Sequence, residues 1–121
     1  MNKPVLAYLA TLMKDGSPQL TPVWYMYDEG KIIVNTADSR TKYRNIRRDP
    51  RVALLIDDEY SYLSIFGKAR VASERDANKD IETLAIIYTG EERGRKAARE
   101  HYSKQKRVSL EIIPDRLVKD L

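Results

Sequence analysis

The sequence predicts an α+β fold, mainly β, in which an antiparallel sheet carries inserted helices. Asp-Gly and Glu-Gly turn signals at 15–16 and 29–30 separate short runs rich in β-branched and aromatic residues, which is typical of consecutive hairpins. Two later stretches, 39–48 and 73–89, repeat apolar residues at helical spacing. Six or seven strands with helices between them favour a small closed barrel, because closure leaves no exposed sheet edge.

The chain of 121 residues is expected to form a single domain, 1–121, because this length supports one hydrophobic core. The net charge is +4 and the pI is near 9.3, which suits an anionic small molecule or a nucleic acid. The sequence has no apolar run of 18 residues and no leader pattern, so we expect no membrane association and a cytoplasmic location. The absence of cysteine excludes disulfides and thiolate metal sites.

The expected strands form one group before the first helix and a second group after it. They span 8–13, 19–27, 31–36, 51–56, 60–72 and 108–113. Pro22 predicts a sheet edge or a bulge in the second strand, because proline cannot donate a ladder hydrogen bond. The continuous apolar run of 51–56 predicts burial on both faces. Gly67 marks a bend or bulge, and Pro114 with Asp115 predicts a turn into a short tail.

Three helices are expected. The first runs over 39–48 and stops at Asp49, because a residue that precedes proline avoids the helical region. The second opens at a capping box of residues 73–76 that begins with a serine, and it ends at Gly90. The third covers 91–104 and is mostly polar.

The stretch 35–48 combines the end of a strand, the start of a helix and five basic residues. Asp38 or Ser39 is the expected N-cap, and the free amides and dipole of the first turn favour an anion such as phosphate. Arg40 adds a planar fork of donors and Lys42 a mobile point charge. At about 100° per residue, the two side chains would point roughly 200° apart if both lay inside the helix. They can share one phosphate only if Arg40 lies where the helix begins.

Several short motifs occur in an order and spacing that indicate a known family. They are Leu9-Ala10-Thr11-Leu12, Asp15-Gly16-Ser17-Pro18, Thr21-Pro22-Val23-Trp24-Tyr25, Asn35-Thr36, Arg40, Lys42, Arg44-Asn45 and Arg47-Arg48-Asp49-Pro50-Arg51-Val52-Ala53. Together they resemble the pyridoxamine 5′-phosphate oxidase-like split β-barrel flavoproteins, and within these the branch that uses FMN or the deazaflavin coenzyme F-420. The resemblance covers residues 7–88 and extends only loosely beyond them.

This resemblance implies a six-stranded antiparallel split barrel that forms a homodimer with two cofactors in its interface. It also implies that Arg40 and Lys42 bind the cofactor phosphate, with Thr36 nearby. The residues that would line the cofactor ring are Thr21, Pro22, Val23, Trp24 and Asn35. The sequence differs from the family at two places: only residues 1–7 precede the first strand, where this branch usually carries a helix, and 60–63 matches the family's aromatic turn only in part.

The expected function is that of an FMN- or deazaflavin-dependent oxidoreductase that acts on a small molecule of unknown identity. The cofactor carries the hydride chemistry in such proteins, and no catalytic acid or base is assigned. The alternatives are a flavin-binding or storage module without turnover and a basic nucleic-acid-binding barrel. The 18 acidic residues nearly balance the 22 basic ones and no nucleic-acid motif is present, which argues against the latter. No metal site is expected, and His101 is expected on the surface.

Overall fold

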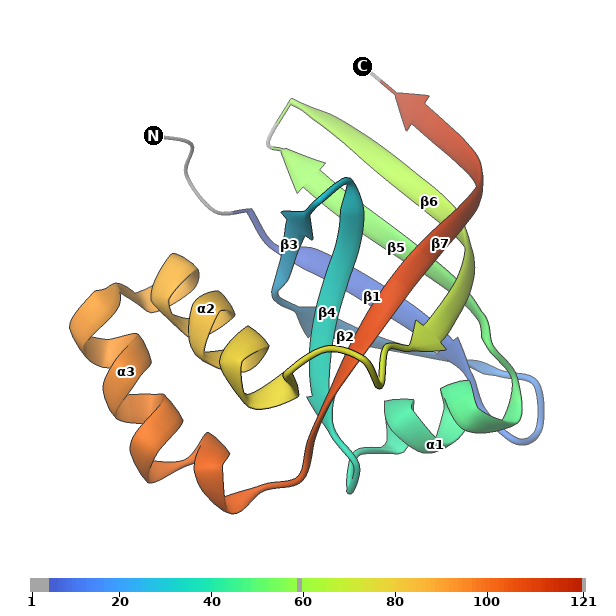
Figure 1. Ribbon diagram of the computed structural model, residues 1–121. Coiled ribbons are helices and arrows are strands. Elements are labelled where there is room, and N and C mark those ends of the chain that lie inside the picture. Colours follow the sequence, from blue (N-terminus) through green and yellow to red (C-terminus); the bar gives the residue numbers. More distant parts are fainter. Residues whose placement is uncertain (1–4, 59, 121) are drawn as a thin grey trace.

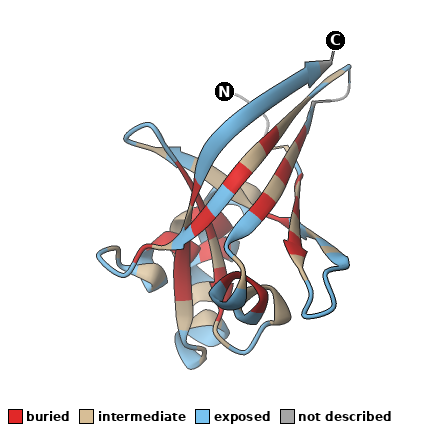
Figure 2. Ribbon diagram, turned by 90° about the vertical axis from the view of Figure 1, so that its right-hand side faces the viewer, coloured by how far each residue is buried: buried red, intermediate tan, exposed pale blue. Residues whose placement is uncertain are grey.

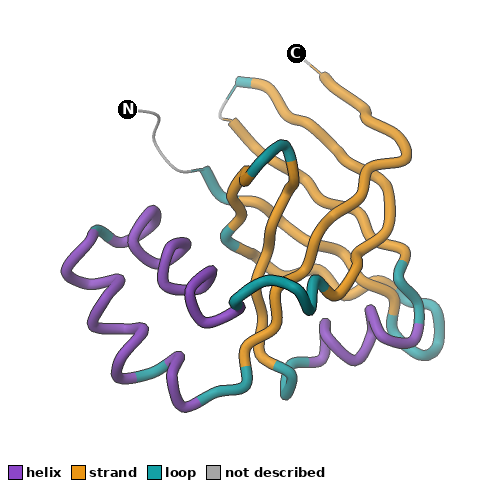
Figure 3. The backbone as a smooth tube through the Cα atoms, in the orientation of Figure 1, coloured by secondary structure: helices purple, strands orange, loops and turns teal. Residues whose placement is uncertain are grey.

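The computed structural model describes residues 5–58 and 60–120, in which a curled antiparallel sheet is flanked by helices (Figure 1). In chain order, the elements of these ranges are β1 (Ala7–Leu12), β2 (Pro18–Val23), β3 (Tyr25–Asp28), β4 (Lys31–Ala37), α1 (Thr41–Arg48), β5 (Arg51–Asp58), β6 (Ser61–Val71), α2 (Ala77–Thr89), α3 (Glu91–Glu100), a 3-10 turn (Tyr102–Lys104) and β7 (Arg107–Asp120). Helices α2 and α3 pack together on one flank of the strands, whereas α1 contacts β1 and β4 (Figure 3). None of the helices in the described ranges is long and apolar enough to cross a membrane.

The sheet curls so that its two edge strands are consecutive in the chain. Its order within the described residues is β2-β1-β5-β6-β7-β4-β3, and only Trp24 separates the edge strands β2 and β3. The single strand predicted over 19–27 is therefore two strands, which gives a seven-stranded sheet instead of the expected six. Pro22 pairs with Tyr8 on edge strand β2, so the edge position predicted from the proline is confirmed. The mainly β, antiparallel barrel-like fold class is likewise confirmed.

The hydrophobic core fills the inside of the curled sheet. Inward-pointing residues alternate with outward-pointing ones along the strands, and Figure 2 shows this alternation as red bands on the ribbon. Leu9 in β1, Leu54 in β5 and Ile65 in β6 are almost completely buried, as are Leu110 and Ile112 in β7. Burial of each such side chain contributes about 1.5–3 kcal/mol relative to exposure.

Strand β5 is buried mainly on its inner face. Val52, Leu54 and Ile56 are buried, whereas Ala53 and Leu55 on the other face are half-buried. The prediction of burial on both faces is therefore wrong for this chain, because no helix of the described ranges makes extensive contact with β5.

Strands β6 and β7 form the longest ladder of the sheet and are interrupted by a bulge at Gly67. This glycine pairs with Pro114, and the register then shifts so that Asp115 is the extra residue on β7. A Cβ atom on Gly67 would collide with the carbonyl oxygen of Ile113, so only glycine fits this close approach. The turn predicted at Pro114 is wrong, because the bulge accommodates the proline and β7 continues beyond it.

The second and third helices form a hairpin. Helix α2 begins after Asp76, whose carboxylate accepts a hydrogen bond from the Lys79 amide at 3.1 Å, so the capping box predicted at Ser73 is wrong. Gly90 ends α2 as predicted, with a φ of 99°. Gly94 lets α3 approach closely, because a Cβ there would clash with the α2 backbone. The predicted helix over 91–104 is α3 followed by the 3-10 turn.

Candidate functional site

The C-terminal half of α1 is anchored to β1, which fixes the position of the helix N-terminus. The Asn45 amide donates to Thr11 Oγ1 at 3.0 Å, and Arg48 donates to the Leu12 carbonyl at 2.8 Å. Ile46 packs in the core beside them. The strongly basic helix is thus tied to the barrel by one buried amide, one arginine and one apolar side chain.

The start of α1 differs from the prediction. Arg40 is the N-cap, with an extended backbone (φ −81°, ψ 147°) and no side-chain capping bond, so the prediction of Asp38 or Ser39 at this position is wrong. The Arg40 amide instead donates to the Ala37 carbonyl at 3.0 Å, which closes a tight turn before the helix. Arg40 precedes the helix, as predicted from helix geometry for two side chains that share one phosphate. Lys42 lies in the first turn, which contains no acidic residue.

A cavity of about 450 Å³ lies beside the start of α1. Among the residues predicted to bind a cofactor, those that line it are Pro22, Val23, Trp24, Asn35, Arg40 and Lys42. They come from β2, the break after it, β4 and the start of α1, which meet here although they are separated in sequence. The volume falls in the range of sites for small molecules and cofactors.

Two of the predicted residues do not line this cavity. Thr36 is buried and pairs with Val108 of β7. Thr21 pairs with Leu9 of β1, and its hydroxyl is enclosed without a hydrogen-bond partner among the described residues. Both threonines therefore lie within the sheet that supports the cavity.

The remaining lining residues were missed by sequence reasoning. They are Leu6, Ile81, Leu84, Tyr102 and Arg107. Ile81 and Leu84 belong to the periodic apolar face of the second helix, which indicates burial but no ligand. Tyr102 and Arg107 carry no local signal, because only the fold brings the 3-10 turn and the start of β7 to the cavity.

Three cations line the cavity without a carboxylate to neutralise them. Within the described residues, Arg40, Lys42 and Arg107 form no ion pair. Burial, together with repulsion from Arg40 and Arg107, lowers the pKa of Lys42 below its ordinary value of 10.5. Burial also lowers the pKa of Arg107. The cavity therefore carries an excess of positive charge that an anion can neutralise.

The other basic residues of α1 do not line the cavity. Arg44 donates to the Ser39 carbonyl at 3.0 Å, and Arg47 donates to the Tyr43 hydroxyl at 2.8 Å. Arg48 is bonded to β1 as described above. These arginines therefore hold the helix and its surroundings in place.

The apolar part of the cavity wall is supported by α2. Its aliphatic and tryptophan side chains are Leu6, Pro22, Val23, Trp24, Ile81 and Leu84, of which the last two belong to α2. The Trp24 ring stacks on the Tyr88 ring with a centroid separation of 5.2 Å. The Tyr88 hydroxyl donates to the Val5 carbonyl at 2.9 Å and accepts from the Tyr25 amide at 3.2 Å. Burial raises the pKa of this hydroxyl, so it stays protonated. Helix α2 thus fixes the backbone where β2 gives way to β3.

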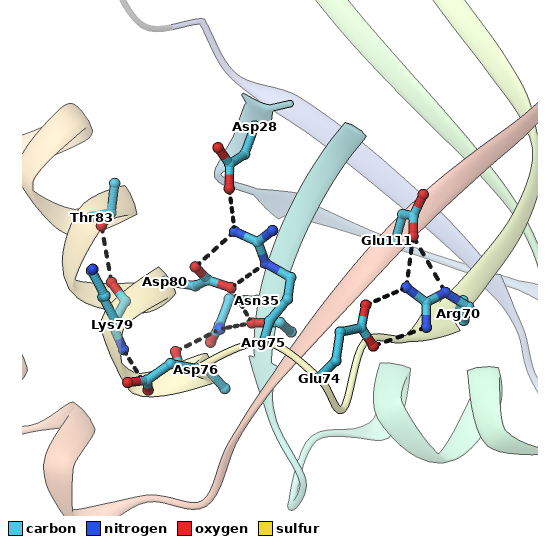
Figure 4. A network of polar contacts seen from close by, with 12 residues as sticks. Asp28, Asn35, Arg70, Glu74, Arg75, Asp76, Lys79, Asp80, Thr83 and Glu111 are labelled. Atoms are coloured by element: carbon cyan, nitrogen blue, oxygen red, sulfur yellow. Dashed lines mark hydrogen bonds and ion pairs between the residues drawn. The ribbon is translucent and has the colours of Figure 1, made fainter. Parts of the chain in front are cut away.

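Asn35 connects the cavity to a polar network beneath it (Figure 4). Its amide nitrogen donates to the Ala77 carbonyl at 3.0 Å and to Ser109 Oγ at 3.2 Å. Its side-chain oxygen accepts from Arg107 Nε at 2.9 Å. Ser109 in turn donates to the Asp80 carboxylate at 2.7 Å. A polar side chain of the cavity wall is therefore held in one orientation.

The fold and this cavity define a class, namely a small antiparallel barrel protein with a positively charged, partly apolar cavity. The sequence model of the family described as pyridoxamine 5′-phosphate oxidase matches residues 1–118. The chain therefore belongs to the pyridoxamine 5′-phosphate oxidase family, and the family indicated by the sequence motifs is confirmed.

Solved structures similar to this chain include proteins of several kinds. A conserved hypothetical protein from Mycobacterium tuberculosis has 28% identity and a TM-score of 0.75, covering 95% of this chain and 76% of that one. A protein named F420 reductase has 27% identity and a TM-score of 0.74, covering 96% and 90%. HutZ, the heme storage protein of Vibrio cholerae, has 16% identity and a TM-score of 0.69, covering 96% and 86%, so this likeness shows the fold alone.

Proposed function

We propose that this protein is an oxidoreductase that binds FMN or the deazaflavin coenzyme F-420 in the cavity beside α1. The observation that supports this most directly is the pairing of two kinds of wall in one cavity. Arg40, Lys42 and Arg107 offer unneutralised positive charge, and Trp24 with its apolar neighbours offers a surface for a planar ring. A flavin or deazaflavin cofactor joins a phosphate to such a ring, so its two halves match the two walls.

Each part of the cavity has a role in this proposal. Arg40 and Lys42 would hold the phosphate, helped by the free amides of the first turn of α1. Val23 and Trp24 would orient the ring, and the buried side chains of α2 would keep water away from it. When bound, the cofactor supplies the hydride chemistry. The protein residues anchor the cofactor phosphate, orient the cofactor ring and exclude water from it. None of them is assigned as a catalytic acid or base.

The similarity to a protein named F420 reductase, at 27% identity over 96% of this chain, favours the deazaflavin over FMN. A histidine, which commonly ligates heme iron, is not among the residues that line the cavity; the one histidine of the chain, His101, is exposed beyond α3. Among the described residues, Tyr102 is the one lining residue of a type that ligates heme iron, and its ring packs against the Arg107 guanidinium at 4.9 Å. We therefore propose a flavin or deazaflavin and not heme.

Titration of the purified protein with FMN and with coenzyme F-420 tests the proposal. Trp24 is the only tryptophan and lines the cavity, so a ring bound there is expected to quench its fluorescence. Calorimetry on the same samples supplies the dissociation constants. If neither cofactor changes the fluorescence or produces heat, the proposal is wrong.

Turnover is tested separately from binding. The loaded protein is mixed with a reduced nicotinamide when FMN is bound, or F-420 is supplied reduced together with an electron acceptor, and the absorbance of the cofactor is followed. A change of redox state over repeated cycles supports an oxidoreductase. Binding without hydride transfer to or from any partner would instead identify a storage module.

We also propose that the protein is a homodimer. Apolar side chains of the β6–β7 ladder are exposed, among them Tyr62, Ile113, Leu117 and Val118, and the end of β7 has no cover in Figure 2. A second copy would remove this surface from water. Light scattering is expected to give twice the chain mass, and Leu117→Asp is expected to give a monomer. Leu20→Asp on β2 is the control, and a monomeric wild type would refute the proposal.

A further inference from the structure

Arg107 is fixed in the cavity by neutral groups. Its Nε donates to Asn35 at 2.9 Å, one terminal nitrogen donates to Gln105 Oε1 at 2.7 Å, and its guanidinium lies 4.9 Å from the centre of the Tyr102 ring. A guanidinium has five N–H donors, so these contacts leave donors unused. The side chain is therefore pre-oriented and still carries its full positive charge, as a residue that binds an anion should.

The orientation of Asn35 is fixed by the Ala77 carbonyl, which accepts from its amide nitrogen at 3.0 Å, and by a connection to a buried carboxylate. Asp80 can only accept hydrogen bonds when ionised, so Ser109 must donate its hydroxyl proton to it. The Ser109 oxygen is then left as an acceptor, and the Asn35 amide nitrogen donates to it. This turns the Asn35 oxygen toward Arg107, where it accepts from Nε.

Asp80 itself does not line the cavity. It is 6% exposed, and Arg75 donates to both of its oxygens, at 2.7 and 3.0 Å. Arg75 is in turn held by Asp28 at 2.7 Å. Figure 4 shows this cluster reaching from α2 and the end of β3 to Asn35. The Asp80 charge thus sets the direction of the Ser109 hydrogen bond and, together with the Ala77 carbonyl, holds Asn35 in the orientation that meets the guanidinium.

We propose that Arg107 is a third residue that binds the anionic group of the ligand, and that Asp80 is its positioning residue, acting through Ser109 and Asn35. The ligand's phosphate would then be held from two sides, by the start of α1 and by the start of β7. The inference rests on the proposed function only for the view that the ligand carries a phosphate. It does not depend on the ring.

The first experiment measures binding by Arg107→Gln and Arg107→Lys. The probes are FMN, by Trp24 fluorescence, and inorganic phosphate, by the rise in the thermal unfolding temperature. Loss of a charged hydrogen bond is expected to weaken FMN binding by about 10- to 100-fold in Arg107→Gln. Arg107→Lys should recover part of this loss, because it restores the charge without the fork. Unchanged affinity for both probes in Arg107→Gln would overturn the proposal.

The second experiment tests positioning with a double-mutant cycle. Asp80→Asn is expected to weaken FMN binding in the wild-type background and to have no further effect in the Arg107→Gln background. A merely structural role would give the same loss in both backgrounds, which would refute the positioning role. Ser109→Ala removes the link between Asp80 and Asn35 without disturbing an ion pair. It replaces Asp80→Asn in the cycle if that variant does not fold.

Glu74→Gln is the matched control. Glu74 holds Arg70 in a separate exposed network at 2.6 Å and should leave binding unchanged. If the wild type binds neither FMN nor F-420, the proposed function fails. The stabilisation of the same variants by inorganic phosphate still tests whether Arg107 binds an anion. If phosphate does not stabilise the wild type either, the inference fails too.

Discussion

The rings of Trp24 and Tyr88 stack with their centroids 5.2 Å apart and their planes 13° from parallel. This contact joins the cavity wall to α2, at the point where one edge strand ends and the other begins. The Tyr88 hydroxyl adds hydrogen bonds to the Val5 carbonyl and the Tyr25 amide. One tyrosine therefore supports both the ring surface and the backbone behind it.

Tyr88→Phe is expected to destabilise the protein by about 1–2 kcal/mol, because it keeps the stacked ring but removes the hydroxyl and its bonds. Urea unfolding followed by circular dichroism measures this change. Tyr27→Phe is the control, since the Tyr27 side chain is 60% exposed. Equal stability of the two variants would show that the hydroxyl contributes nothing.

Arg40→Ala combined with Lys42→Ala is expected to abolish binding of FMN and F-420 while the unfolding midpoint stays close to that of the wild type. Neither residue forms an ion pair within the described residues, so its removal breaks no such contact. Calorimetry and urea unfolding measure the two effects.

Arg93→Ala with Lys96→Ala is the matched control for this pair, because it removes the same charge from exposed positions of α3 outside the cavity. Loss of binding in both double variants would mean that net charge, and not the site, attracts the ligand.

Anion binding is expected to weaken at alkaline pH earlier than an ordinary lysine would allow. The pKa of Lys42 lies below 10.5 because of burial and its cationic neighbours. The attraction is fully present below that lowered pKa and is lost as the pH rises through it. Calorimetry with inorganic phosphate between neutral and alkaline pH measures the loss. In Lys42→Arg the loss should move to higher pH, and an identical profile would exclude Lys42 as its cause.

Asp80 is expected to stabilise the fold above the ordinary carboxyl pKa of 3.8 and to lose this effect in acid. Burial alone would raise its pKa, but hydrogen bonds from Arg75 and Ser109 outweigh burial and lower it. Since the folded pKa lies below the unfolded one, the contribution is lost as the pH falls through the folded value. Unfolding free energies of wild type and Asp80→Asn should therefore converge at low pH. A gap that stays constant would contradict this.

Gly67→Ala is expected to destabilise the barrel by about 1–3 kcal/mol, because its Cβ would overlap the Ile113 carbonyl. Urea unfolding measures the change, and Lys68→Ala, at an exposed position next to it, is the control. Wild-type stability in Gly67→Ala would mean that the bulge relaxes at no cost.

Most of the strands could be predicted from the sequence because turn signals and apolar runs are local. One error occurs where a contact with a distant strand decides the local structure, and another where two nearby residues are both plausible helix caps. Pro114 predicted a turn, yet Gly67 on the neighbouring strand makes room for a bulge that keeps it in β7. Ser73 matched a capping pattern, yet Asp76 is the residue whose carboxylate meets a free amide.

In the candidate site, residues of one local motif were predicted, whereas a residue that the fold brings in from a distant strand was not. Asn35, Arg40 and Lys42 were predicted from a motif that lies within one short stretch, and they line one cavity. Arg107 lies 72 residues from Asn35 in sequence and bonds to it directly. No periodicity or turn signal in the sequence indicates this pair, because it exists only once β4 and β7 are aligned.

Trp24 lines the cavity and is also the residue that connects the two edge strands of the curled sheet, β2 and β3. Strand β2 pairs with β1, and β3 pairs with β4, so this residue is the junction between two ladders. A molecule bound against Trp24 would therefore restrain the two edge strands, β2 and β3, relative to each other. Amide hydrogen exchange in β1 and in β4 should then slow together when the cavity is filled, although the two strands share no hydrogen bond in the sheet order.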